Sequence, residues 1–183
     1  SEQVLPYATS LASTYGSKVT LLHVVEPQAP ELGREPADYL HQVMESAERM
    51  AREYLKRRAE ALGVGGIETE TRVAAGDPST VIGQVTNMED IDLIAMATHG
   101  RSGLGRWLLG SVADKVLHLA GKPMLLVRPQ DPAPHDTALT TVILALDGSP
   151  LAEQILPYAI DMAERLRLTV TIVRVIPTAA MLF

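Results

Sequence analysis

Short apolar runs alternate along the chain with longer stretches in which apolar residues recur every third or fourth position. Runs of the first kind are typical of buried strands, and the three-four spacing is typical of helices with one packed face. Strands are expected over residues 18–25, 67–74, 92–96, 124–127 and 141–146, and helices over residues 2–15, 36–62, 78–88 and 111–120. This alternation predicts an α/β fold with a parallel sheet, helices on both faces and a ligand crevice at the carboxyl ends of the strands.

Turn and cap residues mark several helix ends. Asp77 followed by Pro78 is the pattern of an N-cap and a first helical residue. Pro6 is expected either to bend the first helix or to mark a late start, and Gly63 is expected to end the longest helix. We therefore expect helix boundaries close to these residues.

An internal repeat organises the chain. Residues 2–8, Glu-Gln-Val-Leu-Pro-Tyr-Ala, return as residues 153–159, Glu-Gln-Ile-Leu-Pro-Tyr-Ala, an offset of 151 positions, and the same offset aligns residues 19–22 with 170–173. Because this offset is one domain length, two similar domains in tandem are predicted. The first covers residues 1–128, a proline-rich linker covers 129–140, and the start of the second covers 141–183.

The repeat also indicates an element that the first domain lacks. The second copy of the helix follows an apolar strand and a polar turn, residues 141–150, which have no counterpart before Ser1. A sheet without its central strand leaves backbone groups unpaired on two neighbouring strands. The missing strand could belong to a longer tandem protein of which this chain is a part, which is the simplest interpretation. Alternatively, residues 141–146 fold back into the first domain, or enter another molecule by domain swapping.

A glycine-rich loop, residues 97–111, joins a predicted strand to a predicted helix. Glycines let backbone N–H groups approach an anion closely, and a helix N-terminus adds unpaired donors with partial positive charge. Ser111 could either cap that helix or bond a phosphate oxygen. The arrangement therefore predicts a phosphate site.

Two common phosphate loops are excluded by spacing. A Walker loop needs Gly-Lys-Ser/Thr, but Gly121-Lys122 is followed by Pro123. The dinucleotide fingerprint fails because Leu108 stands where its third glycine belongs. The loop has a different spacing: the small residue Ala97, then two residues, then Gly100, then nine residues, and then Gly110-Ser111.

This spacing resembles the ATP-binding motif of the universal stress protein family, Gly-x2-Gly-x9-Gly-Ser/Thr, with Ala97 at the first glycine. Residues 21–25, 76–78, 92–96, 121–127 and 147–149 also resemble the family's pattern, in the same order. The resemblance implies a Rossmann-like fold of the adenine nucleotide α-hydrolase type, with a five-stranded parallel sheet of order 3-2-1-4-5. It also implies a cytoplasmic, dimeric or pseudo-dimeric protein that takes part in stress resistance, with ATP bound in many members.

Site residues are carried over from this resemblance by position. Val24 resembles the residue whose backbone bonds adenine, and Asp147 resembles the acid that contacts ribose. The expected phosphate motif and its cover are Ala97, His99, Gly100, Arg101, Gly103, Arg106, Gly110, Ser111 and Val112. Because Asp147 belongs to the second copy, the first site is complete only with a missing aspartate or with a borrowed Asp147.

Composition and charge limit the kinds of partner and the cellular location that can be expected of the protein. The formal charge of −6 argues against a nucleic-acid or anionic-membrane surface, and the sequence has no cysteine, which fits a reducing compartment. No apolar run reaches the roughly 18 residues that span a bilayer, and no signal-peptide pattern opens the chain, so a soluble cytoplasmic protein is expected. No catalytic residues or metal-ligand spacing are evident, although Mg²⁺ could arrive with the nucleotide.

Three functional hypotheses follow. The first is a regulatory ATP-binding module, a homodimer with at most slow hydrolysis because no general base is evident near the loop. The second is a dimerisation or interaction module of the same fold without nucleotide. The third, an adenylating enzyme, would need a Ser-Gly-Gly-type loop after the first strand, which Asp147-Gly148-Ser149 is not. The first is favoured.

Overall fold

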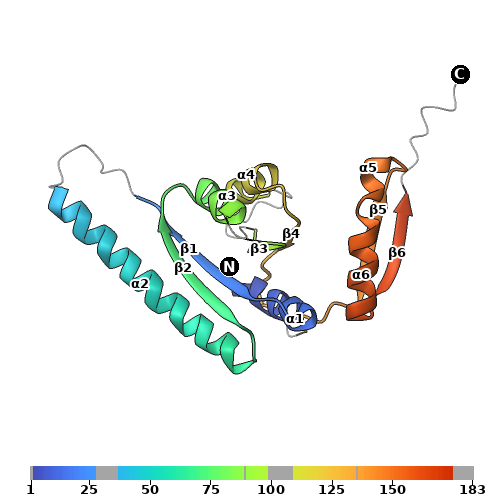
Figure 1. Cartoon of the computed structure of the whole chain (residues 1–183), viewed down its shortest axis with the longest axis horizontal. Helices are drawn as coiled ribbons and strands as arrows, with labels where there is room; N and C mark the ends of the chain where they lie inside the picture. The colour runs from blue at the N-terminus through green and yellow to red at the C-terminus, as the bar shows by residue number, and fades with distance from the viewer. Residues whose placement is uncertain (1, 28–36, 89, 99–108, 135, 175–183) are drawn as a thin grey trace, which may run out of the picture. The chain divides into compact units, whose positions relative to one another are not determined.

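The chain forms two compact units of parallel strands and helices. The computed structural model describes residues 2–27, 37–88, 90–98, 109–134 and 136–174, with the side chains of residues 37 and 38 excepted. The units are residues 1–134 and 135–183, and each is described by itself (Figure 1). Every strand pair in the described residues is parallel, which confirms the α/β class with parallel strands.

The first unit alternates helices with strands. In chain order its elements are η1 (Glu2–Val4), α1 (Leu5–Tyr15), β1 (Val19–Val25), α2 (Ala37–Val64), β2 (Thr69–Ala75), α3 (Pro78–Met88), β3 (Ile94–Ala97), α4 (Ser111–Leu119) and β4 (Met124–Val127). β1 pairs with β2, and β3 pairs with β4. The described strands form separate two-stranded sheets, so the order 3-2-1-4-5 stays a prediction.

Helices pack on the β1–β2 sheet of this unit. α2 packs against β1 and β2, while α3 packs against β1 and α4. Figure 1 shows α2 on one side of the β1–β2 ribbon and α3 and α4 on the other. The buried apolar residues of the unit are Leu11, Ala12, Val25, Ala51, Leu55, Ile67, Val81, Ala113, Val116 and Ala120. Small and β-branched side chains therefore make most of this core.

One helix end differs from the sequence pattern, and at another the structure adopts one of two expected alternatives. Gly63 was expected to end the longest helix, and this is wrong: α2 runs to Val64, and the left-handed turn residue is Gly66, with φ 79°. Glycine costs a helix only about 1 kcal/mol, which packing on two strands can offset. Pro6 is the second residue of α1, after η1, so the late start is the alternative that the structure adopts.

The second unit is a strand, helices and a strand. It contains β5 (Thr141–Leu146), α5 (Pro150–Glu153), α6 (Leu156–Leu166) and β6 (Thr169–Arg174), with β5 parallel to β6 and α6 packed on β5. The bounds of α1 and α6 differ by 151 at both ends, the offset of the sequence repeat. The domain boundaries at 128 and 141 stay predictions.

Candidate functional site

The glycine-rich loop begins at β3 and ends at the first turn of α4. Residues 99–108 of this loop lie outside the described residues. The candidate residues among them are His99, Gly100, Arg101, Gly103 and Arg106. The site is therefore built below from its described ends and from the neighbouring strand β1.

Ala97 occupies the position of the first motif glycine. It is the last residue of β3 and lies opposite Val127 of β4, and the N–H of Thr98 extends the ladder by donating to the Val127 carbonyl at 2.9 Å. Among the described non-glycine residues, Arg167 alone has a positive φ. Since Ala97 has ordinary strand geometry, its methyl group causes no backbone strain there.

The N-terminus of α4 offers free backbone amides. Gly110 is the N-cap, with φ −59° and ψ 147°, and its carbonyl accepts from the Asp114 N–H at 2.9 Å. Ser111 is the first helical residue rather than the cap, and its exposed hydroxyl makes no hydrogen bond within the described part of the chain. The N–H groups of Ser111 and Val112 have no partner inside the helix, so they can donate to an anion.

Charged side chains lie at the starts of α3 and α4. Asp77 caps α3, because its Oδ1 accepts from the backbone N–H of Thr80 at 2.9 Å and from the hydroxyls of Ser79 and Thr80. The Ser79 hydroxyl and then the Thr80 N–H lower the pKa of Asp77 to about 2, with a smaller contribution from the charge of Lys115 on α4. The Asp77 carboxylate therefore uses its hydrogen bonds to cap α3.

Val24 lies one residue before the carboxyl end of β1. The Val19 N–H donates to Glu68 at 2.8 Å and the Val25 carbonyl accepts from Gly76 at 3.0 Å, so odd-numbered residues of β1 face β2. Because successive residues of a strand face opposite edges, the main chain of Val24 faces the other edge, where the described residues place no strand. Its N–H and C=O can bond an outside group.

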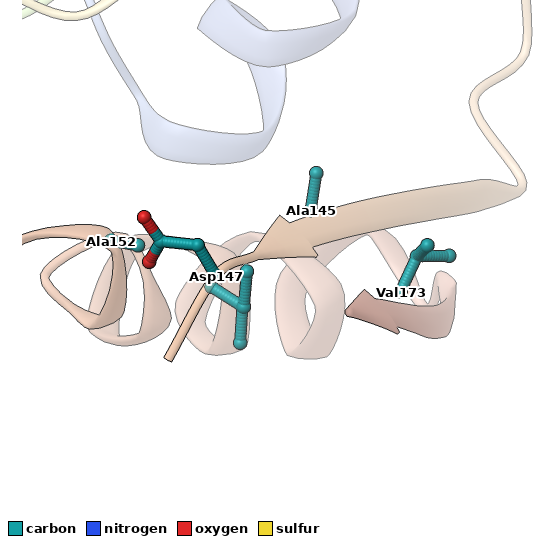
Figure 2. Close-up of a pocket in the computed structure, with 5 residues that line it drawn as sticks. Ala145, Asp147, Ala152 and Val173 are labelled. Carbon is teal, nitrogen blue, oxygen red and sulfur yellow. The ribbon is translucent and has the colours of Figure 1, made fainter. Parts of the chain in front are cut away.

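Asp147 belongs to the second unit, at the end of β5. Its carboxylate accepts from the Ser149 N–H at 2.8 Å, and the Ser149 hydroxyl oxygen caps α5 by accepting from the Ala152 N–H at 3.1 Å. The Ser149 N–H, its hydroxyl and the charge of Arg174 lower the pKa of Asp147. Figure 2 shows Asp147 among the residues that line a small pocket. The volume of this pocket is about 230 Å³. The pocket is lined by Ala145, Leu146, Asp147, Ala152 and Val173.

The side chain of Arg174 lies against the turn at Gly148, and the sequence analysis did not identify this residue. Its guanidinium lies so close to Gly148 that a Cβ there would meet Nη2 at 2.6 Å, and the φ of Gly148 is 87°. The left-handed φ favours glycine at position 148, whereas the guanidinium is the end of a flexible side chain that can shift away from a Cβ. The equivalent position in the first copy is His23, so the sequence repeat gave no signal for this arginine.

The described candidates fall into two groups. Val24, Ala97, Gly110, Ser111 and Val112 belong to the first unit, and Asp147 belongs to the second. Among the described residues, no three or more His, Asp or Glu side chains gather in a way that could hold a metal ion. In the same residues, no helix combines the length and apolar content needed to cross a membrane.

Comparison with known proteins identifies the family. The model of the universal stress protein family matches residues 1–128. The chain belongs to this family. A universal stress protein of Mycolicibacterium smegmatis is 29% identical over 170 residues, 90% of this chain and 56% of that protein, so the chain spans little more than half of this relative.

Two further relatives agree. A universal stress protein of Thermus aquaticus is 35% identical over 124 residues, covering 66% of this chain and 85% of that protein. A crystal structure of a universal stress protein from Archaeoglobus fulgidus is 25% identical, with a TM-score of 0.74 over 97% of this chain and 64% of that one. The UspA-like α/β fold thus extends over both units.

Proposed function

We propose that this universal stress protein is a regulatory module that binds ATP, with the adenine against β1 and the phosphates at the start of α4. The observation that carries the proposal is the pair of free main-chain positions, one at the N-terminus of α4 and the other near the carboxyl end of β1. The N–H groups of Ser111 and Val112 are available for phosphate, and the main chain of Val24 is available for a base edge.

The chemistry of these groups favours binding over turnover. Main-chain donors hold phosphate oxygens without activating water. The Asp77 carboxylate, on which the charge of Lys115 of α4 acts, is engaged in capping α3. We propose that the site binds ATP, with Mg²⁺ carried by the nucleotide, and hydrolyses it slowly if at all. The proposed setting is a cytoplasmic dimer in a stress response.

The first test is whether the protein carries or takes up nucleotide. Purified protein is denatured and its supernatant chromatographed for adenine nucleotides, and the melting temperature is then measured with and without ATP. Bound nucleotide or an ATP-dependent rise supports the proposal, because a ligand that binds only the folded state stabilises it. An empty protein with no rise supports the alternative, a dimerisation or interaction module of the same fold without nucleotide.

The sharper test removes one amide without disturbing the helix. In Ser111→Pro the N–H of the first helical residue is lost, but proline suits this position, and Gly110 at ψ 147° already has the extended geometry that precedes proline. We expect ATP affinity to fall about tenfold or more, the cost of a charged hydrogen bond. The matched control, Ser111→Ala, removes the hydroxyl and keeps the amide. Equal affinities of the two variants would exclude the amide contact.

A further inference from the structure

Lys115 is an exposed charged residue of α4 that has no place in the sequence motif of the candidate site. It follows Ser111 by four residues in the same helix. Residues four apart are neighbours on the surface of an α-helix, with their Cα atoms about 6 Å apart along the axis. The buried residues Ala113 and Val116 fix which side of α4 faces the core. Ser111 and Lys115 therefore share the side that faces away from it.

The Lys115 side chain can reach the free amides at the start of α4. In an α-helix each Cα–Cβ bond tilts toward the N-terminus, so a long side chain covers the turn that precedes its own residue. For Lys115 this turn contains Ser111 and Val112, whose N–H groups have no partner inside the helix. An ammonium group at this end adds a full positive charge to the partial positive charge of the helix N-terminus.

The start of α3 gives independent evidence for where this charge lies. α3 packs against α4, and Asp77 caps α3. The Ser79 hydroxyl and then the Thr80 N–H lower the pKa of Asp77, and the charge of Lys115 makes a smaller contribution in the same direction. Because the interaction between charges falls with distance, the ammonium group lies near the N-terminal end of α3.

The ammonium group of Lys115 is not held in a close ion pair. Within the part of the chain that the structure describes, Lys115 has no carboxylate within 4 Å. The hydrogen bonds that the Asp77 carboxylate accepts all go to Oδ1 and come from Ser79 and Thr80. Asp114, the neighbouring acid on α4, lies about 100° further round the helix. Lys115 can therefore contact an anion without first breaking an ion pair.

We propose that Lys115 is a phosphate-binding residue of the nucleotide site, and that its ammonium group contacts the polyphosphate bound at the N-terminus of α4. This inference rests on the proposed function and adds a side-chain cation to the main-chain donors. The N–H groups of Ser111 and Val112 bond one phosphate group, and the ammonium group bonds oxygens of the same or the next phosphate. Hydrogen bonds between two charged groups are stronger than those between neutral groups.

A lysine in this place makes the affinity depend on the number of phosphates. Adenosine brings no negative charge to the start of α4, whereas each phosphate of a nucleotide adds charge near the ammonium group. The affinity for ATP should therefore depend on Lys115, and the affinity for adenosine should not.

Calorimetric titration with ATP and with adenosine tests the contact. Lys115→Gln removes the charge and keeps a long side chain with good helix propensity. The matched control is Lys122→Gln, because Lys122 is also exposed but follows the other end of α4, and both variants change the net charge equally. We expect Lys115→Gln to bind ATP about tenfold more weakly and adenosine as the wild type does. The control should bind both ligands as the wild type does.

The other outcomes of this titration separate the inference from the proposed function. If all three proteins bind ATP equally, or if both variants lose the same affinity for it, the contact of Lys115 is excluded and the proposed function stands. An equal loss for ATP and adenosine in Lys115→Gln would also exclude the contact, because phosphate would not be involved. If the wild type binds no nucleotide, the proposed function fails and this inference fails with it.

A conservative variant shows whether charge is what the site uses. Lys115→Arg keeps a positive charge on a long side chain, although the geometry of its donors differs. We expect it to recover most of the ATP affinity that Lys115→Gln loses. An affinity as low as that of Lys115→Gln would contradict a role for the charge.

The position of the ammonium group is tested without nucleotide. The Asp77 carboxyl is titrated by NMR in the wild type, in Lys115→Gln and in Lys122→Gln. We expect the pKa of Asp77 to rise in Lys115→Gln and to stay unchanged in the control, because of these two lysines Lys115 is the one whose charge acts on Asp77. An unchanged pKa in Lys115→Gln would place the ammonium group away from the start of α3 and overturn the inference, whatever the nucleotide titrations show.

Discussion

The helix and strand that occur twice in this chain allow a comparison of one local sequence in two surroundings. α1 and α6 have the same length and equivalent bounds, and both end in a left-handed residue, Gly16 with φ 63° and Arg167 with φ 55°. Their burial differs. α1 buries Leu11 and Ala12, whereas α6 buries Ala159, and the last residue of β1, Val25, is buried while every residue of β6 is exposed.

The difference teaches that local structure follows the local sequence, whereas burial follows the neighbours. The first unit covers β1 with α2 and α3, and the second unit has α6 packed on β5. Most helical stability in proteins comes from packing of the apolar face rather than from intrinsic propensity. Equivalent substitutions in the two copies should therefore have unequal effects.

The largest effect is expected from a core truncation. Leu11 is 8% exposed, and Met162, its equivalent at the repeat offset, is half-buried. Leu11→Ala should lower the free energy of unfolding by about 2–4 kcal/mol, through lost burial and a residual cavity. Met162→Ala should cost about half as much or less, because less of its surface leaves water on folding. Urea titration followed by circular dichroism measures both, and equal losses would show that the copies are equally packed.

An intermediate effect is expected at the two helix ends. Gly16→Ala places a Cβ in the left-handed region and should destabilise the first unit by about 1 kcal/mol, although nothing lies within 4 Å of that Cβ. Arg167→Gly relieves the same strain in the second unit and should stabilise it by up to about 1 kcal/mol. Thermal unfolding of both variants checks the opposite signs. A destabilising Arg167→Gly would mean that the arginine side chain contributes more than its backbone costs.

The sequence predicted local structure well and assembly poorly. The strand at 124–127, the cap at Asp77 and the strand at 141–146 lie where periodicity and capping chemistry placed them. Gly63 misled because a glycine ends a helix only where the backbone turns left-handed, and that turn lies at Gly66. Arg174 could not be found, because its contact with Gly148 joins two strand ends that no periodicity relates. Of the candidate site, the strand that holds Val24 and the start of α4 follow from the same local signals, whereas the role of Val24 came from the family resemblance and stays a prediction.

The smallest effect is expected from the cap of α3, compared with that of α5. Both helices are capped by a side-chain oxygen, but Asp77 titrates and Ser149 does not. The pKa of Asp77 is lowered from 3.8 to about 2, so its stabilising effect is present above about pH 4 and is lost as the pH falls toward 2. Asp77→Ser keeps a capping oxygen without this titration. We expect the melting temperature of the variant to fall less steeply than that of the wild type between pH 4 and 2. Parallel profiles would mean that other carboxylates govern acid unfolding.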